Sequence, residues 1–179
     1  MKILFLCGSL EPGRDGVGDY TRRLAAEIIR QRHNASIIAL NDRHCDTIIR
    51  TEQESDETLI PVLRIPDGLS DKERYHMAGD YIQSFNPEWL SLQYVPYSFQ
   101  KKGLPFGLGK RLAIIGQERK WHIMFHELWI RIDKGAPSKH RIIGTPQKRL
   151  TKQRKDVDNL VFIDFVSLHK GASVEEFSI

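Results

Sequence analysis

Apolar residues along the chain fall into short continuous runs separated by sets with helical spacing. Residues 3–7 are apolar at every position, which is typical of a parallel strand covered on both faces. Between residues 19 and 32 the apolar side chains recur at helical spacing, and Arg and Glu occupy the other face. A glycine-rich loop, residues 8–18, joins the two segments. This pattern indicates the strand, loop and helix of a βαβ unit.

The same alternation continues along the rest of the chain. Further strands are predicted at 36–40, 59–65, 89–95, 121–125 and 160–166, and further helices at 71–85, 107–117 and 139–155, the last interrupted at 144–146. Residues 41–57 are acidic and carry no such pattern, so a loop is predicted there.

Strands that alternate with helices form right-handed βαβ units and a parallel sheet. The sequence therefore predicts an α/β fold, a doubly wound, mostly parallel, Rossmann-like sheet of five or six strands with the first strand central. Residues 1–155 are assigned to this domain. Residues 156–179 are assigned to the sixth strand and a divergent tail, which we expect to pack less well outside 160–166.

Ligands of such sheets bind at the carboxyl ends of the strands, so the loops there carry the candidate chemistry. After the first strand come Gly13, Gly16 and Gly18, followed by a helix whose unpaired N–H groups attract anions. This combination suits a phosphate group. The same glycines also suit a tight strand-to-helix turn, because the spacing is neither that of GxGxxG nor that of the Walker loop.

His126 follows the strand at 121–125 directly and should face the same edge. A histidine there can hydrogen-bond a sugar hydroxyl or a phosphate and can move a proton near neutral pH. The adjacent Glu127 either orients His126 or binds a hydroxyl itself. The same two residues are also consistent with an ordinary loop histidine beside a surface charge, without a function. His122 and His126 lie on a strand without the helical HExxH arrangement, so no metal site is predicted.

Aromatic residues mark the loop after the fourth strand. Residues 93–99 and 103–107 combine Tyr and Phe, Tyr94 among them, with Gly and Pro. Such a rim suits stacking against sugar rings or an apolar acceptor, and it equally suits a packed loop anchored by its aromatic side chains.

Composition narrows the class of protein. With 179 residues, 40% of them hydrophobic and 28% charged, the chain has enough apolar mass for a core, which excludes a disordered or collagen-like chain. Cys7 and Cys45 lie far apart without metal-ligand spacing, which indicates reduced thiols in a cytoplasmic protein, with Cys7 buried in the first strand.

The net charge of +4 comes from one segment. Residues 139–155 hold seven Lys and Arg and no acidic residue, while the rest of the chain carries 20 basic and 23 acidic residues. A solvated helix face accounts for this segment, with at most a weak peripheral contact with the inner face of a membrane. We expect no nucleic-acid partner.

Five segments, taken together, resemble a known family. They are residues 2–7, 16–24 (GVGDYTRRL), 89–97 (WLSLQYVPY), 103–107 (GLPFG) and 121–129 (WHIMFHELW). In their order and spacing they resemble the N-terminal domain of a retaining GT-B glycosyltransferase of the family 4 group. The resemblance covers roughly residues 1–155.

The resemblance implies a nucleotide-sugar donor and a sugar or glycolipid acceptor, with no metal or other cofactor. Gly16 and Gly18 would approach the donor diphosphate, and His126 would be the catalytic residue beside the transferred sugar. The residues on the acceptor and sugar side would be Asp19, Tyr20, Tyr94 and Glu127.

Family members also have a C-terminal, donor-binding domain with a characteristic pair of glutamates, and this sequence has no such pair. We therefore expect a truncated or separately encoded half that is inactive alone and needs a C-terminal partner.

Two other functions fit the pattern. One is a dinucleotide-binding oxidoreductase, with Asp42 after the second strand as the ribose ligand. The other is a non-catalytic module that binds a sugar or a partner.

Overall fold

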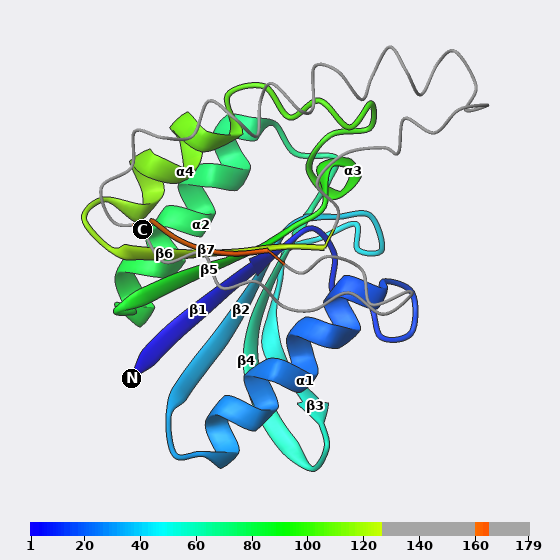
Figure 1. Cartoon of the computed structure of the whole chain (residues 1–179). Coiled ribbons are helices and arrows are strands. Elements are labelled where there is room, and N and C mark those ends of the chain that lie inside the picture. Colours follow the sequence, from blue (N-terminus) through cyan, green and yellow to red (C-terminus); the bar gives the residue numbers. More distant parts are fainter. Residues whose placement is uncertain (127–159, 165–179) are drawn as a thin grey trace, which may run out of the picture.

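One mostly parallel β-sheet organises the protein in a computed structural model that describes residues 1–126 and 160–164 (Figure 1). Its strand order is β3-β4-β2-β1-β5-β6-β7, and every neighbouring pair is parallel except β3 and β4. The strands are β1 (Lys2–Cys7), β2 (Asn34–Asp42), β3 (Ile49–Ser55), β4 (Thr58–Pro66), β5 (Trp89–Tyr94), β6 (Lys120–Phe125) and β7 (Leu160–Asp164). The predicted α/β class and the central position of β1 are confirmed, and the fold is compatible with a Rossmann-like one.

Helices cover both faces of this sheet. They are α1 (Gly16–Arg30), α2 (Asp71–Phe85), α3 (Pro96–Phe99) and α4 (Leu108–Gly116). Figure 1 shows α1 on one face and α2 with α4 on the other. Strand side chains alternate accordingly, because Ile3, Phe5 and Cys7 join the apolar layer under α1, whereas Leu4 and Leu6 join the layer under α2 and α4. The continuous apolar run of β1 is therefore explained by burial on both faces.

The prediction of a loop over residues 41–57 was wrong, because it missed β3. This strand forms an antiparallel hairpin with β4 at the edge of the sheet. Its sequence, IRTEQES, is polar and mostly exposed, so no apolar alternation marks it. The turn is made by Asp56 and Glu57, whose φ values of 49° and 60° match the two left-handed positions of a tight hairpin.

Other boundaries differ by a few residues for local reasons. Helix α1 begins at Gly16 rather than at Asp19, because Asp15 caps it. The short helix α3 was not predicted, and it begins with Pro96 at its first position. The predicted basic helix at 139–155 lies outside the described residues, as does the tail at 156–179 apart from Leu160–Asp164, which pairs with β6 as a sixth parallel strand.

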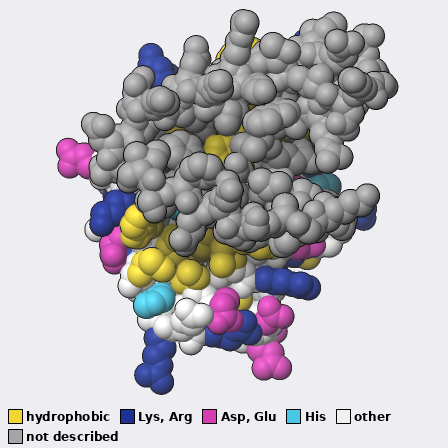
Figure 2. All heavy atoms as spheres, viewed as in Figure 1, with side chains coloured by type: hydrophobic (Ala, Val, Ile, Leu, Met, Phe, Trp, Pro, Cys, Tyr) yellow, Lys and Arg dark blue, Asp and Glu magenta, His cyan; other side chains and the backbone are white. Residues whose placement is uncertain are grey.

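Exposed charged side chains are visible along one edge of the molecule. Figure 2 shows Lys, Arg, Asp and Glu side chains along the lower edge of the molecule, where Figure 1 places the C-terminal end of α1 and the β3–β4 turn. This is the end of the sheet at which the parallel strands begin. Such exposed charges are ordinary for a solvated surface. Ligands of parallel sheets bind at the opposite, carboxyl edge.

The fully buried carboxylate of Asp42 anchors the loop between β1 and α1. It accepts hydrogen bonds from Ser9 Oγ at 2.9 Å, from the Leu10 N–H at 3.1 Å and from Arg64 Nε at 2.7 Å. Arg64 also donates to the Glu11 carboxylate at 2.6 Å. Burial alone would raise the pKa of Asp42, but the hydrogen bonds, above all from Arg64, outweigh it and hold that pKa below its usual value.

Helix α1 approaches this loop closely at Gly18. A Cβ added there would lie 2.6 Å from the Ser9 carbonyl oxygen, which is too short for any side chain. At Gly16 a Cβ would meet no atom of a described residue within 4 Å. The glycine at 18 is therefore required by packing, and the glycine at 16 is not.

The two glycines give a matched test of this packing. Gly18→Ala should destabilise the fold by about 1–3 kcal/mol through overpacking, whereas Gly16→Ala should change stability by less than about 1 kcal/mol. Urea unfolding of both variants measures the difference. Equal midpoints for the two variants would contradict the assigned role of Gly18.

The Asp42–Arg64 ion pair predicts how the stability of the fold changes at acid pH. Because the folded pKa of Asp42 is lowered from 3.8, its stabilisation is complete above about pH 4 and is lost as the pH falls through the folded pKa. Asp42→Asn leaves Arg64 without its buried anion and should cost about 3 kcal/mol at pH 7. The variant should also lose less stability than the wild type between pH 5 and pH 2, measured by urea unfolding. The control, Asp56→Asn in the exposed β3–β4 turn, should follow the wild type.

Candidate functional site

The candidate site lies at the carboxyl edge of the sheet, where His126 meets the start of α1. The His126 N–H donates to the Tyr94 carbonyl oxygen at 3.0 Å and so extends the β5–β6 pairing by one residue. Its imidazole meets the Tyr20 ring edge-on, with ring centroids 5.2 Å apart and an interplanar angle of 76°. His126 and the start of α1 therefore lie at the same edge of the sheet, as predicted, and the ring contact is made by Tyr20 of α1.

The Asp15 carboxylate is the charged group that acts on the His126 imidazole. The same side chain caps α1, since Oδ1 accepts the N–H groups of Val17 and Gly18, both at 3.0 Å. Such a cap stabilises a helix by about 1 kcal/mol. Burial lowers the pKa of His126, and the Asp15 carboxylate raises it by a smaller amount, so the net shift is downward. The imidazole is therefore mainly neutral near pH 7.

The Asp15 carboxylate makes phosphate binding at the N-terminus of α1 less favourable, because it already occupies N–H groups of the first turn. An anion there would use the free N–H groups of the first turn, and Asp15 already accepts the N–H of Gly18. The Gly16 N–H makes no hydrogen bond to a described residue. Of the two glycines predicted to approach a diphosphate, Gly16 therefore has no described partner for its N–H, and Gly18 serves packing and capping.

Asp19 and Tyr20 have different parts in this geometry. Asp19 forms an ion pair with Arg22 and accepts the Gly13 N–H at 3.0 Å. Arg22 in turn donates to the Leu10 carbonyl at 3.0 Å. Asp19 thus shapes the glycine loop from within. Tyr20 is 41% exposed and presents its ring at the rim, beside His126.

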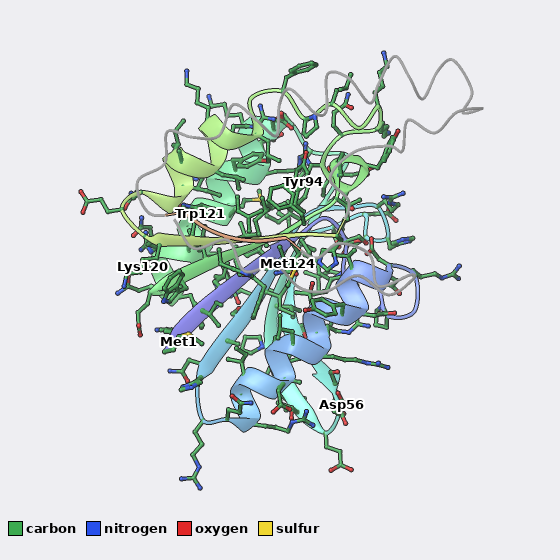
Figure 3. The ribbon with its side chains drawn as sticks, in the orientation of Figure 1. Met1, Asp56, Tyr94, Lys120, Trp121 and Met124 are labelled. Atoms are coloured by element: carbon green, nitrogen blue, oxygen red, sulfur yellow. The ribbon has the colours of Figure 1, made fainter. Side chains whose placement is uncertain are left out.

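Tyr94 does not belong to this site. Its ring is 4% exposed and lies in the apolar layer under α2 and α4, stacked on Phe99 at 6.1 Å and edge-on to Phe125 at 5.4 Å. Figure 3 shows Tyr94 and Met124 on opposite sides of the sheet, Met124 being on the side of α1. The prediction that placed Tyr94 on the sugar side is corrected, because strand alternation directs its ring to the other face. Glu127 lies outside the described residues.

Behind His126 lie three polar side chains, Gln93, Ser91 and His122, for which the sequence patterns predicted no role. Gln93 Oε1 lies 2.9 Å from His126 Nε2, and Gln93 Nε2 donates to Ser91 Oγ at 2.9 Å. Ser91 Oγ lies 2.8 Å from His122 Nδ1. A signal was present in the sequence, since Ser91 and Gln93 alternate with Leu90 and Leu92 and so line one face of β5.

Other chemistry finds little support among the described residues. There, no three His, Cys, Asp or Glu side chains gather as metal ligands would, and none of the helices is long and apolar enough to cross a membrane. No protein-family model matches the chain, and a search of curated proteins finds no significant match. The fold and the site thus define an α/β protein with a candidate ligand site between the start of α1 and the end of β6.

Asp15 allows a test of the electrostatics of the site. Asp15→Asn keeps an oxygen that can cap α1 but removes the negative charge that favours the imidazolium. The pKa of His126 should therefore fall below its wild-type value, as measured by NMR titration of its ring protons. The control, Asp56→Asn at the far edge of the sheet, should leave that pKa unchanged. An unchanged or raised pKa in Asp15→Asn would show that the carboxylate does not act on His126.

Proposed function

We propose that this chain is the acceptor-side α/β domain of a retaining, nucleotide-sugar-dependent glycosyltransferase of the GT-B kind. The observation that carries the proposal is the contact of His126 with Tyr20 beside the capped start of α1. It brings together two of the five family-like segments, residues 16–24 and 121–129, at the edge where parallel sheets bind ligands.

The side chains at this edge suit a sugar better than a fully charged ligand. A neutral imidazole can hydrogen-bond one sugar hydroxyl, and the half-exposed Tyr20 ring offers an apolar surface to the sugar's C–H groups. The Gly16 N–H, which has no partner among the described residues, can donate to one phosphate oxygen of the donor. In this proposal a second domain holds the nucleotide, and no metal is needed.

A pocket further along the same edge supports an acceptor site. It has a volume of about 220 Å³ and is lined by Asn41, Arg43, Asp67, Tyr97 and Lys101. Asn41 lies near the end of β2, and the other residues follow β2 and β4 or belong to α3 and its flank. Its lining combines three charged side chains with the Asn41 amide and the Tyr97 phenol. Such a lining suits a polar or anionic acceptor group.

A dinucleotide-binding oxidoreductase is less consistent with the structure. That function needs an acid at the end of β2 to bind the ribose hydroxyls. The residue there, Asp42, is fully buried and already accepts hydrogen bonds from Ser9, Leu10 and Arg64. Its carboxylate is therefore committed to the fold.

Binding measurements on this chain test the proposal. We expect a panel of nucleotide-sugars and their monosaccharides to include ligands with dissociation constants on the order of millimolar, because half a cleft excludes little water. His126→Ala should weaken that binding about five- to tenfold, the value of one hydrogen bond. The matched control, His76→Ala, removes an exposed histidine of α2 on the other side of the sheet and should bind as the wild type does.

The readout is calorimetric or NMR titration of the wild type and both variants, with NAD as the competing class of ligand. Binding of NAD in preference to every sugar would favour the oxidoreductase. Sugar binding that His126→Ala leaves intact would remove His126 from the site. Sugar binding without transfer, after a complementary donor-binding domain is added, would favour the non-catalytic module.

A further inference from the structure

Four polar side chains form a continuous hydrogen-bonded chain along the α1 side of β5 and β6. In order they are His122, Ser91, Gln93 and His126, with links of 2.8, 2.9 and 2.9 Å. Ser91 and Gln93 are fully buried. Register explains the arrangement, because Ser91 pairs with His122 and Gln93 pairs with Met124, two residues before His126 and on the same face of β6.

The two links that Gln93 makes have a fixed direction. The Gln93 carboxamide has one donor end and one acceptor end, and its Nε2 donates to Ser91 Oγ. Its Oε1 is left to face His126 and can only accept, so the hydrogen in that link belongs to His126 Nε2. Ser91 Oγ, which accepts from Gln93, also contacts His122 Nδ1, and its hydroxyl can serve as donor or acceptor in that link.

The consequence for His126 is a defined tautomer. With Nε2 protonated, the neutral imidazole carries its lone pair on Nδ1, which has no hydrogen bond to a described residue. A lone pair attracts a hydroxyl hydrogen and repels a phosphate oxygen. The nearby Asp15 carboxylate, whose charge acts on His126, also disfavours an anion there.

We propose that Gln93 and Ser91 are positioning residues that hold His126 in the Nε2–H tautomer, so that Nδ1 recognises a hydroxyl group of the ligand rather than a phosphate. This inference rests on the proposed function for the identity of the ligand as a sugar. The positioning itself rests only on the hydrogen-bonded chain, and it is tested without any ligand.

Long-range ¹H–¹⁵N correlation spectra distinguish the two nitrogens of a neutral imidazole. In the wild type at pH 8, where burial keeps both histidines neutral, His126 should show a protonated Nε2 and an unprotonated Nδ1. Ser91→Ala removes the acceptor that orients the Gln93 amide without contacting His126, so the amide can turn and the two tautomers should mix. Gln93→Met removes the link to His126 and should also give a mixture. The control, Ser84→Ala on the exposed side of α2, should leave the spectrum unchanged.

Folding of each variant is checked by its amide spectrum and its unfolding midpoint. The proposal is overturned if wild-type His126 is protonated on Nδ1. It is also overturned if both Ser91→Ala and Gln93→Met fold and keep the wild-type tautomer, since the chain would then be merely structural.

Ligand titrations separate this inference from the proposed function. A bound monosaccharide should shift the His126 Nδ1 resonance, and inorganic phosphate at the same concentration should not. A phosphate-induced shift of Nδ1 at pH 8 would overturn the preference for a hydroxyl. A locked tautomer in a protein that binds no sugar at all would reject the proposed function and leave the positioning role of Gln93 and Ser91 standing.

Discussion

The geometry of the candidate site depends on one buried ion pair, Asp42 with Arg64. A charged pair with so little exposed surface is unfavourable unless its remaining hydrogen-bonding capacity is used, and here the loop between β1 and α1 uses it. Ser9 and Leu10 bind Asp42, and Glu11 binds Arg64. The same loop then passes under α1 at Gly18, with no room for a side chain. The first turns of α1 are thereby held at the end of the sheet where His126 emerges.

The alternation of side chains along β5 and β6 places apolar residues on one face of the sheet and polar residues on the other. The even-numbered residues of β5 and the odd-numbered residues of β6 form the apolar layer under α2 and α4. The other faces of these strands carry Ser91, Gln93 and His122, which are polar and linked to one another. Buried polar groups of this kind are stable when they are hydrogen-bonded, and a satisfied chain is rigid. A histidine at the end of such a chain is oriented before any ligand arrives, which lowers the cost of binding.

Much of this arrangement could be predicted from the sequence, and the failures have physical causes. The buried strands and helix α2 carry strong patterns, and Ser70 with Glu73 marks the start of α2 as a capping box. Strand β3 was missed because an exposed edge strand needs no apolar face. Tyr94 was misplaced because its aromatic neighbours suggested a rim, although strand alternation beside Gln93 would have assigned it to the core. The role of Asp15 depends on a capping geometry that the glycine spacing does not reveal.

The central claim is that a sugar hydroxyl binds at His126, between the start of α1 and the end of β6. The most direct measurement is a crystal structure of the chain with the tightest-binding sugar compound from the titrations. The account predicts a hydroxyl of the ligand within hydrogen-bonding distance of His126 Nδ1, with the sugar ring against Tyr20. A ligand located elsewhere, with the His126 and Tyr20 rings in contact and Nδ1 facing no ligand atom, would contradict it.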